Sequence, residues 1–148
     1  VLVQQGLAPA HPEQLSDRQQ QEIWSQVYQF WARPNLDSAT PPPHSTGAAV
    51  DVTLVDAHGR VVDMGSAIDE LSPRSFPNYF GPGEAGDQGD RTLTFHRDRT
   101  LLAEIMTAAG FLQHPNEWWH FSAGDQLWAW LMMQRQPKTA YIARYGRV

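Results

Sequence analysis

Apolar residues recur at helical spacing in two stretches of the chain. The first stretch follows a candidate N-cap at Ser16, and the second ends before Gly110, a residue type that commonly terminates helices. Because residues three or four positions apart share one face of a helix, we predict helices over residues 16–32 and 96–109. We expect both apolar faces to pack into the core; they consist of Ile23, Trp24, Val27, Phe30 and Trp31, and of Leu101, Leu102, Ile105, Met106 and Ala109.

Alternating and β-favouring residues predict short strands elsewhere. Residues 49–55 alternate, residues 56–60 have the composition of a turn, and residues 61–64 return the chain, which is typical of a β-hairpin. These elements predict an α+β fold in which two main helices pack on a small antiparallel sheet. Similar runs predict further strands at residues 1–3, 117–122, 127–133 and 140–145.

The composition is that of one globular domain. The chain has 148 residues, of which 41% are hydrophobic and 18% charged, so we expect a single domain over residues 1–148. A formal net charge of −5 and scattered Lys and Arg residues argue against a nucleic-acid partner. We predict no membrane span, because no apolar run approaches the roughly 18 residues that cross a bilayer.

Two stretches carry the candidate chemistry: residues 44–51, which begin with His44 and end with Asp51, and residues 117–120, which begin with Glu117 and end with His120. The chain has no Cys, so a metal would have to bind His, Asp and Glu side chains. Two imidazoles and a carboxylate, with a second carboxylate beside them as a base, are the groups of a mononuclear zinc hydrolase. We therefore predict a zinc site at these two stretches.

The local pattern bears on this prediction in three ways. Prolines at 41–43 restrict the backbone before His44, which suits a rigidly placed ligand and equally an ordinary connecting loop. Asp51 lies in an apolar strand, where an unpaired carboxylate would cost several kcal/mol, so it needs a partner such as zinc. On a regular strand Glu117 and His120 would point to opposite faces, so a twist, a bulge or the strand end must lie between them.

Residues 73–91 are rich in Pro, Gly, Asn and Asp, and predict a long loop. Loops beyond about 12–15 residues in a compact domain are usually functional or mobile. This loop could form a wall or lid of the site, or be a disordered surface segment. We expect His58, at the hairpin turn, and His96, at the start of the second helix, to lie on the surface.

The two motifs resemble those of a known enzyme family. His-x-x-Gly-x-Ala-x-Asp followed by Glu-x-Trp-His is similar to the zinc D-Ala-D-Ala peptidases, and Glu-Trp-Trp-His resembles the D-alanyl-D-alanine dipeptidases of the vancomycin-resistance type. The resemblance covers roughly residues 44–122 and includes the stretch 64–69. It implies the D-Ala-D-Ala metallopeptidase fold, which is Hedgehog-like.

The resemblance also implies a role for each residue. His44, Asp51 and His120 would bind one Zn²⁺, and Glu117 would act on the zinc-activated water as general base and then as general acid. Asp69, in the stretch that matches Met-Gly-x-x-x-Asp, would bind the amino group of the substrate. That substrate would be the D-alanyl-D-alanine dipeptide, and the physiological role, in cell-wall turnover or in resistance, stays open.

The chain departs from the family pattern at Ala8, where the family carries an Arg that stabilises the oxyanion. Losing one such donor commonly costs on the order of 10² to 10³ in rate. Arg33 or Arg74 could substitute for it. Family members also have more chain before their early strand, so we expect an N-terminal portion to be missing here.

Two alternatives remain open beside the dipeptidase. The first is a D,D-carboxypeptidase or another peptidase of the peptidoglycan stem, which would need an open groove for a longer peptide. The second is a zinc-binding homologue of impaired activity, for which Ala8 is the reason. We expect a cytoplasmic location, with the periplasm as the alternative.

Overall fold

The computed structural model describes residues 14–28, 35, 37 and 39–147. The chain divides into two compact units, Val1–Arg33 and Pro34–Val148. The expected single domain over residues 1–148 stays a prediction. The strand expected at residues 1–3 lies outside the described residues.

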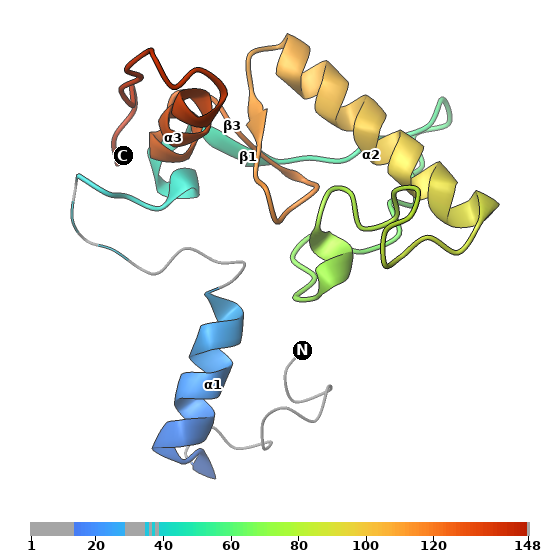
Figure 1. Cartoon of the computed structure of the whole chain (residues 1–148), viewed down its shortest axis with the longest axis horizontal. Helices are drawn as coiled ribbons and strands as arrows, with labels where there is room; N and C mark the ends of the chain where they lie inside the picture. Colours follow the sequence, from blue (N-terminus) through green and yellow to red (C-terminus); the bar gives the residue numbers. More distant parts are fainter. Residues whose placement is uncertain (1–13, 29–34, 36, 38, 148) are drawn as a thin grey trace. The chain divides into compact units, whose positions relative to one another are not determined.

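In the first unit, helix α1 spans Asp17–Val27 (Figure 1). Ser16 forms a capping box, in which its side chain accepts the backbone N–H of Gln19 and its own N–H donates to the Gln19 side chain. The predicted helix is confirmed over these residues, and residues 29–32 lie outside the described part. No described residue of α1 is buried, and Trp24 stacks on Tyr28, so the predicted packing of this face into a core is not seen.

The second unit is built on a three-stranded antiparallel sheet. Strand β3, His120–Ser122, lies between β1, Ala49–Asp51, and β2, Leu112–Gln113 (Figure 1). The register pairs Asp51 with His120 and Leu112 with Ser122. Pairing therefore places a carboxylate of one motif opposite an imidazole of the other.

Helix α2, Asp90–Ala108, packs against β2. It ends where the sequence predicts but begins six residues before 96, because Gly89 turns the chain with φ 93° and Asp90 supplies negative charge to the first turn. Thr92 and Thr94 near this start weaken the helical pattern of the sequence, which explains the late boundary predicted there.

The core lies between α2 and the sheet. Val50, Val52 and Leu54 pack against it, as alternation predicts for the face opposite Asp51. The buried cluster consists of Met64, Leu102, Trp118, Trp119 and Phe121.

The predicted hairpin is present in reduced form. After β1 the chain continues to one isolated antiparallel bridge between Val55 and Val61, around a turn in which Asp56 accepts the backbone N–H groups of His58 and Arg60. His58 is exposed at this turn, as expected. The 73–91 segment begins with a single 3₁₀ turn, η3, Pro73–Ser75, and continues through further turns to α2.

The strands predicted at 127–133 and 140–145 are wrong. Helix α3 spans Gln126–Arg135, capped by the Asp125 side chain, and residues 140–147 have no regular secondary structure. The run from Leu127 is almost continuously apolar, so it shows neither the helical nor the strand period clearly. Its Trp residues favour a strand, but the cap at Asp125 and the packing of the segment stabilise a helix. The α+β class with a small antiparallel sheet is nevertheless confirmed.

Candidate metal centre

His44 is placed by a 3₁₀ turn, η2, Pro43–Thr46, that leads into β1. The N–H of Ser45 donates to the carbonyl of Pro42, and the Thr46 hydroxyl bridges Pro43 O and Ala48 N. Gly47 then reverses the chain with φ 68°, a conformation that favours glycine. The prolines therefore fold directly into the turn that carries the imidazole.

One oxygen of Asp51 lies near both imidazoles. Its Oδ1 is 3.1 Å from His120 Nδ1 and 3.3 Å from His44 Nε2. The two rings meet edge to face, with centroids 4.6 Å apart. The three ligand atoms that these residues offer all lie within 4.8 Å of one another.

This donor set fits a divalent metal. Tetrahedral zinc with ligands at about 2.0–2.1 Å holds them roughly 3.3 Å apart, close to the separations of Asp51 Oδ1 from the two imidazole nitrogens. Side-chain exposure falls from 52% for His44 through 26% for Asp51 to 5% for His120, so one side of the cluster faces solvent. Three protein ligands with an open side are typical of catalytic zinc sites.

Asp51 is poised as a charged ligand. Burial alone would raise its pKa, but the hydrogen bond with His120 and the charges of His44 and His120 outweigh burial and hold the pKa below the ordinary value. A carboxylate that stays ionised is the form that binds a cation.

Glu117 lies beside these ligands and outside the strand. Residues 118 and 119 form a bend between Glu117 and β3, so strand alternation does not apply between Glu117 and His120. Glu117 Oε2 is 3.5 Å from His120 Nδ1, and the side chain is 7% exposed. The bend thus resolves the conflict that the sequence pattern raised.

The surroundings of Glu117 favour its protonated form. Burial raises its pKa to about 7; the charge of His120 opposes this rise, and the charges of Asp51 and Asp69 add to it. A carboxyl group with a pKa near neutrality can both accept and release a proton at neutral pH.

Asp69 is close enough for its charge to act on Glu117. It is exposed and holds a left-handed backbone conformation with φ 63°, which is uncommon outside glycine. Its predicted role toward a substrate amino group stays a prediction.

Two further residues of the centre were missed from the sequence. The His114 ring lies 5.4 Å from that of His120, and its Nδ1 accepts the N–H of Asn116 at 3.1 Å. Burial lowers the pKa of His114 to about 4, so the imidazole is neutral at pH 7.

Ser122 Oγ, fully buried, lies 3.4 Å from His120 Nε2. Ser122 stands two residues after His120, and a period of two would have placed both on one face.

Arg33 and Arg74 are the residues expected to replace the missing oxyanion Arg. Ala8, where the family carries that Arg, and Arg33 lie outside the described residues. The Arg74 guanidinium donates to the carbonyl of Gly65 and lies 3.5 Å from the Glu70 carboxylate, so it is held within its own loop.

His96 is not at a helix start but in the second turn of α2, and it is half-buried.

Comparison with known proteins identifies the family of the chain. A family profile described as D-ala-D-ala dipeptidase matches residues 8–141. The chain belongs to this family. It is 56% identical over 136 residues to a D-alanyl-D-alanine dipeptidase of Synechocystis sp., covering 90% of this chain and 55% of that protein. It is 41% identical over 86 residues to a D-alanyl-D-alanine dipeptidase of Escherichia coli, covering 58% of this chain and 40% of that protein.

A third member of the dipeptidase family, from Enterococcus faecalis, is 34% identical over 89 residues, which are 60% of this chain and 40% of that protein. The chain spans about half the length, or less, of these curated relatives. Within the described residues, no helix is long and apolar enough to cross a bilayer. The cytoplasmic location stays a prediction.

Proposed function

We propose that the protein hydrolyses the D-alanyl-D-alanine dipeptide and that Zn²⁺ bound by His44, Asp51 and His120 is its metal. The observation that carries the proposal is the convergence of these three ligands on one point, with the Glu117 carboxylate 3.5 Å from His120 Nδ1. Membership of the D-ala-D-ala dipeptidase family supports the substrate.

The metal would supply Lewis acidity and lower the pKa of a water in its open position toward about 7. Glu117 accepts a proton from the attacking water as the water oxygen bonds to the peptide carbonyl carbon. When the carbon–nitrogen bond breaks, Glu117 donates that proton to the leaving amine, and two D-alanine molecules result. In the metal-free chain burial raises the pKa of Glu117 to about 7, which suits a group that must gain and then lose one proton near neutral pH.

Asp69 is proposed to bind the ammonium group of the substrate. Its charge reaches Glu117, so an ammonium group paired with Asp69 would lie within the same site. Binding the free amino terminus in this way would select a dipeptide over a longer chain.

A second candidate function is a D,D-carboxypeptidase of the peptidoglycan stem. The exposed side of the cluster at His44 is the observation that favours it, because an open side could admit a longer peptide. Rates on the free dipeptide and on a stem pentapeptide separate the two functions. A faster reaction on the pentapeptide would favour the carboxypeptidase.

The main test uses the full-length protein. Elemental analysis should find one zinc per chain, and a ninhydrin-type assay should detect free D-alanine released from D-Ala-D-Ala. Glu117→Gln should lower kcat by about 10² to 10⁴ while zinc content is unchanged. Full activity of this variant would contradict the proposed base.

An impaired homologue is tested by Ala8→Arg. A large gain in rate would show that the wild type lacks an oxyanion donor. An unchanged rate would mean that another group provides it.

A further inference from the structure

Every polar group of Trp118, the residue after Glu117, forms a hydrogen bond. Its N–H donates to Ser75 O at 2.9 Å, its carbonyl accepts the side-chain N–H of Gln113 at 2.8 Å, and its indole N–H donates to Ser66 Oγ at 2.9 Å. The side chain is also buried, at 2% exposure. The backbone that presents Glu117 therefore takes its position from these partners.

Ser66 connects three segments through one hydroxyl. Its Oγ accepts the Trp118 indole N–H and, at 3.1 Å, an N–H of Arg99, and it donates to the carbonyl of Arg74 at 3.2 Å. A hydroxyl has one donor and two acceptor positions, so all three are used. Removing this oxygen would leave the buried Trp118 and Arg99 donors without their partner.

Arg99 anchors this hydroxyl from α2. Its Nε donates to Met64 O at 2.8 Å and its Nη1 to Phe76 O at 2.9 Å, while its guanidinium lies over the rings of Phe80 and Trp118. Arg99 is 1% exposed, and burial lowers its pKa to about 10, which leaves it charged at neutral pH.

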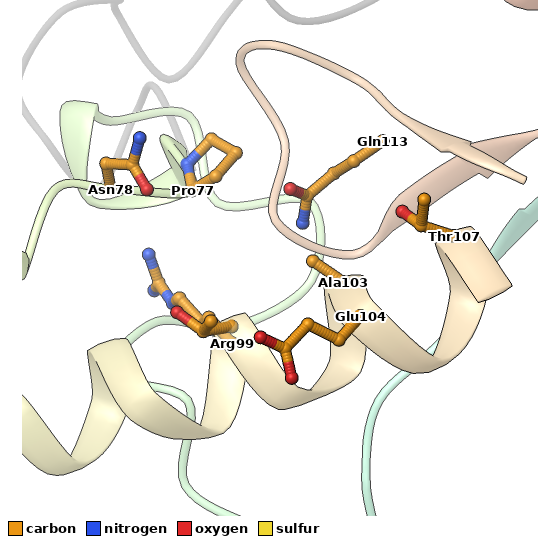
Figure 2. A pocket seen from close by; sticks show the side chains of 8 residues that line it. Pro77, Asn78, Arg99, Ala103, Glu104, Thr107 and Gln113 are labelled. Atoms are coloured by element: carbon orange, nitrogen blue, oxygen red, sulfur yellow. The ribbon is translucent and has the colours of Figure 1, made fainter.

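Figure 2 shows Arg99 rising from α2 toward the loop that carries Pro77 and Asn78, with Gln113 opposite. These residues line a cavity of about 400 Å³. Through its bonds to Met64 O and Phe76 O, the Arg99 side chain fixes the loop between these two residues on α2.

Ser66 also lies three residues before Asp69, within that same loop. We propose that Ser66, anchored by Arg99, is a positioning residue that sets Asp69 relative to Glu117. The hydroxyl joins the two segments: the Trp118 bond fixes the segment of the general base, and the Arg99 and Arg74 bonds fix the segment of the ammonium-binding carboxylate. This inference rests on the proposed function, because it assigns Ser66 to the placement of substrate between these two groups.

The variant Ser66→Ala removes one oxygen and little volume. In the full-length protein we expect kcat/KM for D-Ala-D-Ala to fall about 10- to 100-fold, with a higher KM, since misplacement by about 1 Å can cost that much. Zinc content should be unchanged. Ser66→Thr, which keeps the hydroxyl, should restore most of the activity. Thr100→Ala is the matched control, because its exposed hydroxyl donates to the carbonyl of His96 in its own helix.

A double-mutant cycle with Asp69→Asn separates positioning from a general structural effect. If Ser66 acts through Asp69, the combined loss in kcat/KM will be clearly smaller than the product of the two single losses. Losses that multiply, or a Ser66→Ala variant with wild-type kcat/KM, would overturn the inference. A wild-type protein that does not cleave the dipeptide would instead contradict the proposed function.

Discussion

Glu117 combines its proposed role as general base with a cost to folding. A carboxyl group whose pKa rises from 4.5 to about 7 on burial is less stable when ionised in the folded chain than in the unfolded chain. The cause is mainly burial, with the nearby charges of Asp51 and Asp69 adding to it. Such tension between stability and function is typical of groups that must exchange protons at neutral pH.

We predict that Glu117→Gln stabilises the metal-free protein above pH 7. Between pH 4.5 and about 7 the folded wild type keeps a proton that the unfolded chain releases, so its stability falls as pH rises through this window. The Gln variant has no such loss, and its advantage should grow by about 3 kcal/mol across the window and then level off. Urea unfolding with a chelator present measures this difference. An advantage that does not change with pH would contradict the raised pKa.

Ser122 should tune the metal affinity of His120. If Nδ1 of His120 binds the metal, its Nε2 carries the proton and donates to Ser122 Oγ, which lies 3.4 Å away. We predict that Ser122→Ala weakens zinc binding about 10- to 100-fold, because such outer partners orient the ligand ring. Competition with a chromophoric chelator measures the affinity. Thr94→Ala, which removes an exposed hydroxyl bonded within α2, should leave it unchanged. Equal affinities for all three proteins would exclude this role.

At the residue scale, the sequence predicted residue types better than their geometry. His44, Asp51, Glu117 and His120 could be chosen because their chemistry is specific and the chain lacks Cys. Their convergence could not be deduced, because it depends on the pairing of β1 with β3 and on a bend that no periodicity describes. His114 was missed because its burial arises from packing that the sequence does not reveal.

At the scale of elements, the register of the short strands brings the candidate metal ligands together. Pairing of Asp51 with His120 sets the separation of two candidate ligands, and η2 adds the third candidate from the residues just before β1. A slip of one residue would turn these side chains to the opposite face. Predicting the helices at 16–32 and 96–109 required only a period, whereas predicting this register required knowledge of which strands pair.

Helix α3 depends on a buried cap. The Asp125 Oδ1 accepts the N–H of Trp128 at 2.7 Å, and Asp125 is 1% exposed. We predict that Asp125→Ala lowers the free energy of unfolding by about 1–2 kcal/mol, because the first turn of the helix loses its acceptor. Asp125→Asn keeps a capping oxygen and should lose less. Urea unfolding followed by Trp fluorescence compares the two variants, and equal losses would show that the cap is not the cause.

At the scale of the whole molecule, the candidate ligands connect parts of the chain that are far apart in sequence. His44 and Asp51 belong to η2 and β1, and His120 belongs to β3, about seventy residues later. A cation held by all three would bind only the folded arrangement. Metal binding and folding should therefore be thermodynamically linked.

We predict that zinc raises the stability of the full-length protein in proportion to the logarithm of its concentration. At 100 times the dissociation constant, binding to the folded state alone adds about 2.7 kcal/mol. A chelator should reverse the gain.

Asp51→Asn should abolish most of the stabilisation by zinc, because Asp51 Oδ1 is the atom that lies near both imidazoles. Asp56→Asn is the control, since Asp56 accepts hydrogen bonds from His58 and Arg60 within its own turn. Thermal unfolding across a zinc titration tests the linkage. If wild type and Asp51→Asn respond to zinc alike, the metal is bound elsewhere and the site at His44, Asp51 and His120 is wrong.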